Sequence, residues 1–294
     1  MSAIMFIVNP RAARGKAATV AEILRDRCRN LKLDFDIVFT KNPGHATELA
    51  AQGAEKFDTV VVVGGDGSVN EVVNGVVGTS AKFGIIPVGS GNDFVRVLGI
   101  PLSMNDALDT VCRGHTRLID LATAGSRYFN NGLGIGFDAW VVQESFSIKY
   151  LRGNLIYLTA VLKTVYKYKS PQMRLTYNDV IRDEKLFMIT VGNGTSLGGG
   201  FKLTPNALVD DGLLDLNIIC DLTKLKVFRN LIGVYSGNHI HLPEVTTDRT
   251  TDLVIESEQG FAAHVDGELL ALDLKKLEVH IVPKSLEVIV PDTE

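Results

Sequence analysis

Short apolar runs alternate with helical patterns over the first third of the chain. The run Thr59–Val63 is almost entirely valine, which is typical of a strand buried on both faces. Between such runs, apolar residues recur every three or four positions, the spacing of a helix packed on one face. The expected strands are 3–8, 35–40, 59–63 and 83–88, and the expected helices are 19–29, 45–57, 68–77 and 105–114. This alternation predicts an α/β domain with a mostly parallel sheet.

The pattern changes after about residue 117. Short strand-like runs separated by Gly, Asn and Asp then follow one another. These runs are 127–143, 172–179, 185–193, 213–220 and 251–257. The sequence therefore predicts a nucleotide-binding α/β domain over 1–117 and a β-rich, β-sandwich-like domain over 118–283. The last segment, 284–294, is expected to pack back on the first domain.

Composition narrows the class of protein. The 294 residues are 46% hydrophobic, enough for one large domain or two of ordinary size. The net charge of −4 argues against a nucleic-acid binder, which is normally basic. The three cysteines are far apart and form no CxxC, so we expect neither a disulfide framework nor a zinc site. No apolar run approaches the roughly 20 residues that cross a bilayer, so we expect a cytoplasmic protein.

A glycine-rich turn follows the valine run. In "GGDGS", Gly64 to Ser68, the turn leads into a helical pattern, and Ser68 and Glu71 have the spacing of a capping box. Free N–H groups at a helix N-terminus attract phosphate, and glycines let the backbone approach it. Asp66 suits such a site if its carboxylate holds Mg²⁺ or its waters. A tight strand-to-helix turn without a ligand, in which Asp66 acts as a cap, is the alternative.

A second corner repeats this design and favours the phosphate site. Strand 84–88 is followed by the loop "GSGND", Gly89 to Asp93, and a short helix. The carboxyl ends of parallel strands are where open α/β sheets bind ligands. The two loops together predict a metal-assisted phosphate site at one edge of the sheet.

Several motifs carry a family resemblance over almost the whole chain. They are "VNPRAARGK", "GGDGS", "PVGSGNDFVR", "GGGFKLTPNALVDDGLLDL" and "HVDGE". With these, the chain resembles the diacylglycerol kinase catalytic-domain family, specifically the bacterial soluble lipid kinases, whose fold is shared with NAD kinases and sphingosine kinases. Ser68 and Ser90 stand where the family more often has threonine, and both keep the hydroxyl.

The resemblance implies an ATP-dependent kinase that phosphorylates a lipid hydroxyl, with diacylglycerol as acceptor and phosphatidic acid as product. It implies Asp66 as a catalytic residue near the metal and phosphates, and Glu268 as the base that takes the acceptor proton. It implies a structural Mg²⁺ bound by the carboxylate of Asp211 and the backbone carbonyls of Leu208 and Leu213. The implied ATP-binding residues are Thr40, Gly64, Gly65, Asp66, Gly67, Ser68, Val69, Asn70, Ser90 and Asp93.

Residues 147–172 contain five basic residues, four tyrosines and no acid. Such a segment suits an anionic lipid surface, so we expect a peripheral contact with the inner membrane face. The alternative is a helix that buries its apolar stripe on the second domain and leaves its lysines in water. A homodimer stays open as a further expectation.

Other interpretations remain. Phosphatidylglycerol, a sphingoid base or NAD are alternative acceptors on the same fold. "GTSLG", Gly194 to Gly198, matches a hydrolase nucleophile elbow with Ser196 as nucleophile, but the residues after it show no helical period. His264 is expected to be structural. In "HIH", His239 and His241 are expected on one strand face, with no third metal ligand in view.

Overall fold

The computed structural model describes residues 3–12, 17–148 and 154–292. The chain divides into two compact units, Met1–Asp120 with Pro283–Glu294, and Leu121–Val282. Arg14 and Lys16 of the first motif, and Lys149 and Arg152 of the basic segment, lie outside the described residues.

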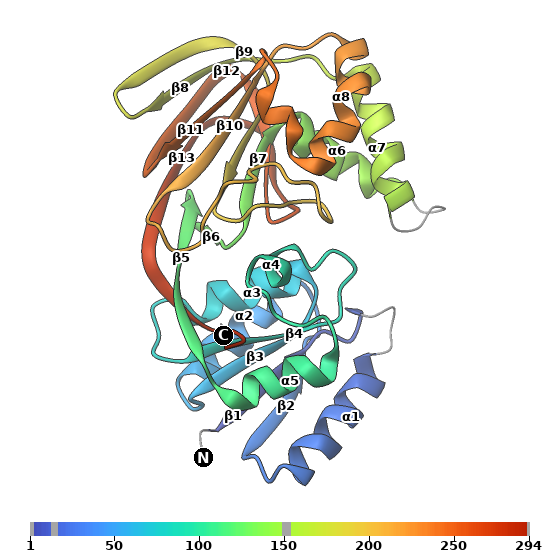
Figure 1. Ribbon diagram of the computed structural model, residues 1–294, viewed down its shortest axis with the longest axis vertical. Helices are drawn as coiled ribbons and strands as arrows, with labels where there is room; N and C mark the ends of the chain where they lie inside the picture. Colours follow the sequence, from blue (N-terminus) through green and yellow to red (C-terminus); the bar gives the residue numbers. More distant parts are fainter. Residues whose placement is uncertain (1–2, 13–16, 149–153, 293–294) are drawn as a thin grey trace. The chain divides into compact units, whose positions relative to one another are not determined.

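The N-terminal unit is built on a parallel sheet (Figure 1). Its strands run in the order β2-β1-β3-β4, and the end of β13 pairs with β4 in parallel as well. Strands β1 and β3 are buried along their whole length, which explains their uninterrupted apolar sequence. The strands are β1 (Ile4–Val8), β2 (Phe35–Phe39), β3 (Thr59–Gly64), β4 (Lys82–Pro87) and β13 (Glu268–Ile289).

The helices of this unit lie between its strands in the chain, as the alternation of patterns predicts. They are α1 (Ala17–Asn30), α2 (His45–Ala54), α3 (Asp66–Val76), α4 (Asp93–Val97) and α5 (Met104–Arg113). Helix α3 buries Val69, Val72, Val73 and Val76. These apolar positions hold it against the sheet and fix where its N-terminus lies.

The predicted capping box is wrong. Helix α3 begins at Asp66 with Gly65 as N-cap, so Ser68 already lies in the first turn. The Ser68 hydroxyl instead accepts a hydrogen bond from Asn9 Nδ2 at 2.8 Å. Glu71 Oε2 accepts the backbone N–H of Ala46 at 3.2 Å and therefore serves the N-terminus of the neighbouring helix α2.

The C-terminal unit is an antiparallel β structure with helices against it (Figure 1). Its main path runs β11-β10-β9-β7-β12-β13, with β8 paired to β9 and β12. One apolar core lies among the strands, and a second contains residues of α6, α7 and α8. The strands are β5 (Thr116–Ala124), β6 (Arg127–Phe129), β7 (Gly132–Gly136), β8 (Gln172–Tyr177), β9 (Val180–Gly192), β10 (Leu214–Cys220), β11 (Val245–Thr250) and β12 (Asp252–Val265). The helices are α6 (Phe137–Ser145), α7 (Asn154–Lys167), α8 (Lys224–Ser236) and the short 3₁₀ helix η2 (Asn238–His241).

The architecture of two units, the second rich in β-strands, is confirmed. The mostly parallel sheet expected for the first domain is present in strands β1 to β4. The described strands as a whole pair mostly antiparallel, because the β-rich second unit contributes most of them. Two local expectations are wrong. The run 127–143 ends in helix α6, and His239 and His241 lie in a 3₁₀ helix, not on a strand face.

Helix α7 confirms the helical pattern in the basic segment. None of the described helices is long and apolar enough to cross a bilayer.

Candidate functional site

Strands β1, β3 and β4 of the N-terminal unit end at the same edge of the sheet. Val8 pairs with Val63, and Gly64 pairs with Pro87. The backbone N–H of Thr40 bonds the carbonyl of Val8 at 3.0 Å. This register brings the predicted nucleotide-binding positions Thr40, the Gly64–Asn70 turn and the Ser90–Asp93 loop to one edge, the place that open α/β sheets use for ligands.

Asp66 ties the two glycine-rich loops together. Its Oδ2 accepts the backbone N–H of Asn92 at 2.8 Å, and its Oδ1 accepts that of Asp93 at 2.9 Å. These donors lie at the start of the short helix α4. The carboxylate therefore caps α4 while standing in the first turn of α3, a cross-link that the sequence did not reveal.

Two glycines allow this close approach. A Cβ built on Gly89 would lie 2.5 Å from the Cα of Gly65 and 2.8 Å from Oδ1 of Asn92. Any side chain at Gly89 would force the loops apart. The glycines are thus needed for contact between backbones, in addition to any approach of phosphate.

Asn9 also lies at this edge, although no role was predicted for it from the sequence. Its side chain donates to Ser68 Oγ, and its backbone N–H bonds the carbonyl of Val63 at 3.1 Å. Asn9 lies in the "VNP" motif directly after the first strand, so the signal was present. Its spatial partner is 59 positions away, which no local spacing rule reaches.

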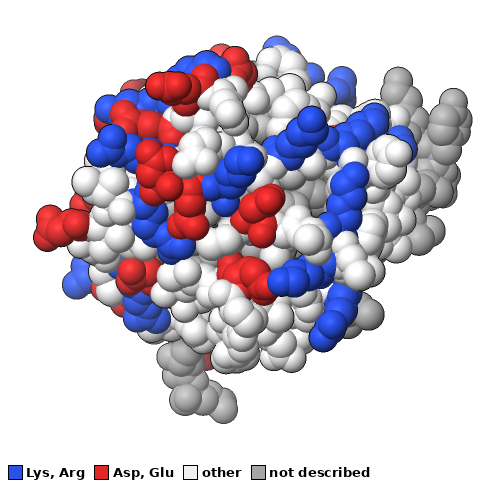
Figure 2. Space-filling view, turned by 90° about the horizontal axis from the view of Figure 1, so that it is seen from above, with Lys and Arg blue, Asp and Glu red and all other residues white. Residues whose placement is uncertain are grey.

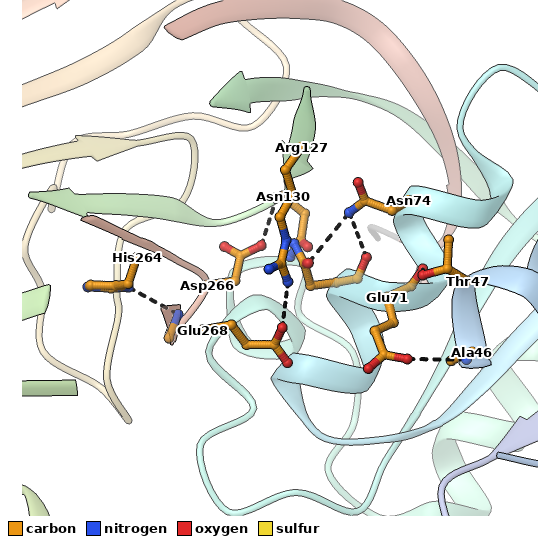
Figure 3. A network of polar contacts seen from close by, with 11 residues as sticks. Ala46, Thr47, Glu71, Asn74, Arg127, Asn130, His264, Asp266 and Glu268 are labelled. Carbon is orange, nitrogen blue, oxygen red and sulfur yellow. Dashed lines mark hydrogen bonds and ion pairs between the residues drawn. The ribbon is translucent and has the colours of Figure 1, made fainter. Parts of the chain in front are cut away.

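In the C-terminal unit, Asp266 anchors the turn that precedes Glu268 (Figure 3). Its carboxylate accepts the backbone N–H groups of Asn130, Asn131 and Gly132 at 3.1, 3.0 and 2.9 Å. All three bonds are buried. Asp266 and Gly267 both adopt positive φ, 49° and 84°. This turn is fixed in shape and in place against the segment between β6 and β7.

Glu268 lies directly after this turn and faces Arg127 (Figure 3). The guanidinium Nη2 of Arg127 is 2.5 Å from Glu268 Oε2. Both side chains are partly exposed, at 30% and 39%. Glu268, which the family resemblance implies as the base, is therefore a carboxylate that solvent can reach and that Arg127 holds.

His264 and Asp138 form a buried pair beneath the same turn. His264 Nε2 lies 3.3 Å from Asp138 Oδ2, and His264 Nδ1 accepts the backbone N–H of Gly267 at 3.3 Å. Gly134 leaves them room, because a Cβ there would lie 1.9 Å from Asp138 Oδ2. The pair supports the turn from inside the unit.

The acidic turn after "GGGFKLTPNA" is organised around Arg249. Asp211 Oδ1 accepts the backbone N–H of Leu213 at 3.1 Å, and its Oδ2 is 3.6 Å from Arg249 Nη1. Asp215 Oδ2 is 3.5 Å from Arg249 Nε without forming a hydrogen bond. Burial raises the pKa of the Asp215 carboxyl, and Arg249 opposes that shift. Among the described residues, no group of three or more His, Cys, Asp or Glu side chains is arranged to hold a metal.

The proposed nucleophile elbow does not have the required form. Gly194–Gly198 follows strand β9 but leads into turns and an isolated bridge between Leu197 and Phe201. An elbow runs from a strand directly into a helix. The hydrolase interpretation is not supported.

Two family models of known proteins each match one part of this chain. Residues 3–124 match the family model "Diacylglycerol kinase catalytic domain", and residues 131–290 match "YegS C-terminal NAD kinase beta sandwich-like domain". A probable lipid kinase YegS-like of Chromohalobacter salexigens is 32% identical over 267 residues, covering 86% of this chain and 84% of its own. A diacylglycerol kinase of Mycobacterium tuberculosis is 30% identical over 295 residues, covering 97% and 94%.

Solved structures show the same fold. The crystal structure of a putative diacylglycerol kinase from Bacillus anthracis superposes with a TM-score of 0.81 at 27% identity, covering 99% of this chain and 97% of that one. This structural match, the two family models and the relatives together show that the chain belongs to the diacylglycerol kinase family and is a diacylglycerol kinase-like lipid kinase.

Proposed function

We propose that this kinase phosphorylates diacylglycerol at a membrane surface, using ATP and forming phosphatidic acid. Its relatives named diacylglycerol kinase support this acceptor. The observation that carries the proposal is the outer face of helices α7 and α8, which exposes large apolar side chains beside lysines. Such a face suits a lipid acceptor better than NAD or a sugar.

Helix α7 is apolar on two faces. It buries Ala160, Val161 and Val165 in the C-terminal unit, as the buried-helix alternative expects. Leu158, Leu162 and Tyr166 recur every four positions on another face and are exposed, Tyr166 at 77%. The burial of one face therefore leaves a second apolar stripe without cover among the described residues.

Helix α8 carries a matching stripe. Leu225, Phe228 and Tyr235 are exposed, Leu225 at 77%. The two helices meet at Lys224, whose Nζ donates to the carbonyl of Tyr166 at 2.7 Å and lies 4.5 Å from the centre of its ring. Contiguous exposed apolar side chains of this kind mark sites of protein or membrane contact.

Basic side chains surround the stripes and favour a bilayer as the occupant. Figure 2 shows Lys and Arg side chains in a run with few acids among them, on the side where Figure 1 draws α7 and α8. Lys163 pairs with Glu144 and Lys226 with Glu244, whereas Lys167 and Lys169 have no ion pair among the described residues. Exposed basic residues beside apolar ones bind anionic lipid surfaces.

The position of helix α3 supports the proposal that the N-terminal unit binds ATP. The N-terminus of the helix lies at the carboxyl edge of the sheet, with Gly65 as N-cap and Asp66 and Gly67 in the first turn. Free N–H groups and a partial positive charge would therefore face an approaching phosphate. Each Asp66 oxygen accepts one hydrogen bond and keeps a second lone pair. Asp66 therefore suits the metal and phosphate role as well as its cap. Mg²⁺ bound with ATP would neutralise phosphate charge.

Glu268 would act as the general base. In the proposed step its carboxylate takes the proton of the acceptor hydroxyl while that oxygen bonds the γ-phosphorus. The bond from phosphorus to the β–γ bridging oxygen breaks, and ADP leaves with the electron pair. Partial exposure and a rigid mounting of Glu268 suit a base that must reach an oriented hydroxyl.

A structural Mg²⁺ at the acidic turn would be held by the Asp211 carboxylate and the carbonyls of Leu208 and Leu213. Oxygen ligands of this kind fit Mg²⁺. Asp215 Oδ2 supports the site, since it is buried beside the turn without a hydrogen bond, although Arg249 Nε lies 3.5 Å from it. The ion would supply positive charge that stabilises the turn.

The test is a phosphotransfer assay with γ-labelled ATP and the purified protein. Diacylglycerol, phosphatidylglycerol and sphingosine would be supplied in anionic vesicles, with NAD and glucose in solution. The proposal expects label in phosphatidic acid at a rate at least about tenfold above any other acceptor. A higher rate with another acceptor would replace diacylglycerol as the substrate, and transfer only to NAD or glucose would reject the lipid proposal.

A further inference from the structure

Arg127 and Glu268 stand on two segments that buried hydrogen bonds join. Arg127 begins strand β6, three positions before Asn130. Glu268 begins β13, two positions after Asp266. The Asp266 carboxylate binds the backbone of residues 130–132 through three bonds. The backbone positions from which Arg127 and Glu268 extend are therefore held close to each other.

A contribution to the stability of the fold does not explain why this ion pair is held so firmly. Ion pairs that are as exposed as this one contribute little to folding. The same chain has a comparable partly exposed pair, Arg182 with Glu184 at 2.6 Å, whose two members lie on one strand, β9. The Arg127 pair differs because its carboxylate is the proposed base.

We propose that Arg127 is a positioning residue for phosphoryl transfer, an inference that rests on the proposed role of Glu268 as base. Among the described residues, Arg127 engages Oε2 of Glu268 and no contact engages Oε1. The guanidinium holds one oxygen and stops the side chain from turning, so that Oε1 is left to accept the hydroxyl proton. A planar guanidinium fixes the orientation of a carboxylate better than the point charge of lysine.

Figure 3 shows Arg127 extending from its strand toward Glu268, with Asp266 beside it. No sequence pattern pointed to this pair, because its members are 141 positions apart. Only the fold of the C-terminal unit brings them together.

The test is a double-mutant cycle with Arg127→Met, Arg127→Lys and Glu268→Gln, measured as kcat and KM for ATP with diacylglycerol vesicles. Misplacing a catalytic group costs up to about 100-fold, so we expect Arg127→Met to lower kcat by about 10- to 100-fold with KM for ATP within about twofold. Arg127→Lys should recover part of this loss. In the Glu268→Gln background, Arg127→Met should lower kcat by less than about threefold, because residues that act as a unit are not additive. Arg182→Met is the matched control and should leave kcat unchanged.

Two results would overturn the inference while the proposed base stands. One is an Arg127→Met enzyme with wild-type kcat beside an impaired Glu268→Gln enzyme. The other is an equal loss from Arg127→Met in both backgrounds, which would mean that Arg127 acts on something other than Glu268. A Glu268→Gln enzyme with wild-type kcat would instead reject the base itself, and the positioning role with it. Each variant should unfold at the same urea concentration as the wild type, which shows that a change in kcat is not due to loss of fold. If Arg127→Met does not fold, Arg127→Lys takes its place in the cycle.

Discussion

Asp66 binds the backbone of Asn92, which lies 26 positions further along the chain, through a hydrogen bond of 2.8 Å. Its other oxygen binds the next backbone N–H, that of Asp93. One carboxylate thus holds both glycine-rich loops at the edge of the sheet. The proposed nucleotide site and the stability of the N-terminal unit would therefore be coupled through this residue.

Asp66→Asn should weaken both properties. An amide offers one acceptor oxygen, and its NH₂ group would face the second backbone donor. We expect a loss of about 1–3 kcal/mol in the free energy of unfolding, the usual cost of leaving a buried polar group unpaired, and a loss of ATP binding. Urea unfolding and calorimetric titration with Mg-ATP measure the two effects. Asp36→Asn is the control, since within the described part of the chain the Asp36 carboxylate bonds only the N–H of Ile37, and it should change stability by less than about 0.5 kcal/mol. Wild-type unfolding and ATP affinity in Asp66→Asn would contradict the coupling.

Asp211→Ala should abolish stabilisation by Mg²⁺. An ion that binds only the folded state adds RT ln(1 + [L]/Kd) to stability, so the melting temperature of the wild type should rise with added Mg²⁺. The variant should melt lower and respond little. Thermal unfolding at several Mg²⁺ concentrations without nucleotide measures this, with Asp248→Ala as the control that keeps the response. An equal rise in wild type and Asp211→Ala would remove Asp211 from the metal site.

The sequence predicted elements better than contacts, for physical reasons. A valine run such as Thr59–Val63 reports its own burial, and all four early strands lie within a residue or two of their expected bounds. Helix α6 was missed because the glycine-rich β7 precedes it and makes the whole run look like strand.

The candidate site depended on chemistry that spacing does not encode. Local spacing paired Ser68 with Glu71, but the helix begins at Asp66 and tertiary partners took both side chains. The Arg127 pair and the three bonds to Asp266 join residues more than 130 positions apart. The family motifs identified Glu268 as a candidate base, whereas its contact with Arg127 and the anchored turn before it became visible only in the fold.

Membrane binding should depend on lysines and on the apolar stripes in different ways. Neutralising Lys163, Lys167 and Lys169 together should weaken binding to anionic vesicles by up to about 3 kcal/mol at low salt. Tyr166→Ser with Leu225→Ser should weaken binding at high salt as well, by up to about 1.5–3 kcal/mol per side chain if each is fully buried in the lipid. Vesicle sedimentation at two salt concentrations measures both. Ile181→Ser, which removes an exposed side chain on β9, should bind as wild type. If all variants sediment with vesicles as the wild type does, α7 contributes to the apolar core and not to membrane binding.

Because of His239, the free energy of unfolding should decrease as the pH drops below neutral. The His239 ring is buried, and its Nε2 lies 2.6 Å from Nδ2 of Asn217, which also donates to the carbonyl of Leu203. Burial lowers the pKa of His239 from 6.5. The unfolded chain then binds the proton first, so stability is lost as pH falls below about 6.5, with a slope of up to about 1.4 kcal/mol per pH unit.

The difference between wild type and His239→Gln isolates this effect. Urea unfolding between pH 5 and 7 should show a flatter pH dependence in the variant, while His241→Gln, at an exposed position of the same 3₁₀ helix, should keep the wild-type slope. Parallel curves for wild type and His239→Gln would show that His239 does not titrate differently in the two states.

The most direct test of the account is the turnover of Glu268→Gln with diacylglycerol vesicles and γ-labelled ATP. Glutamine keeps the size of the side chain and its hydrogen bond to Arg127 but cannot take the acceptor proton. We expect kcat to fall by about 10²–10⁴-fold, the usual contribution of a general base, while ATP affinity in direct titration stays near that of the wild type. A kcat within threefold of wild type, measured where chemistry limits the rate, would contradict Glu268 as the base and the mechanism built on it.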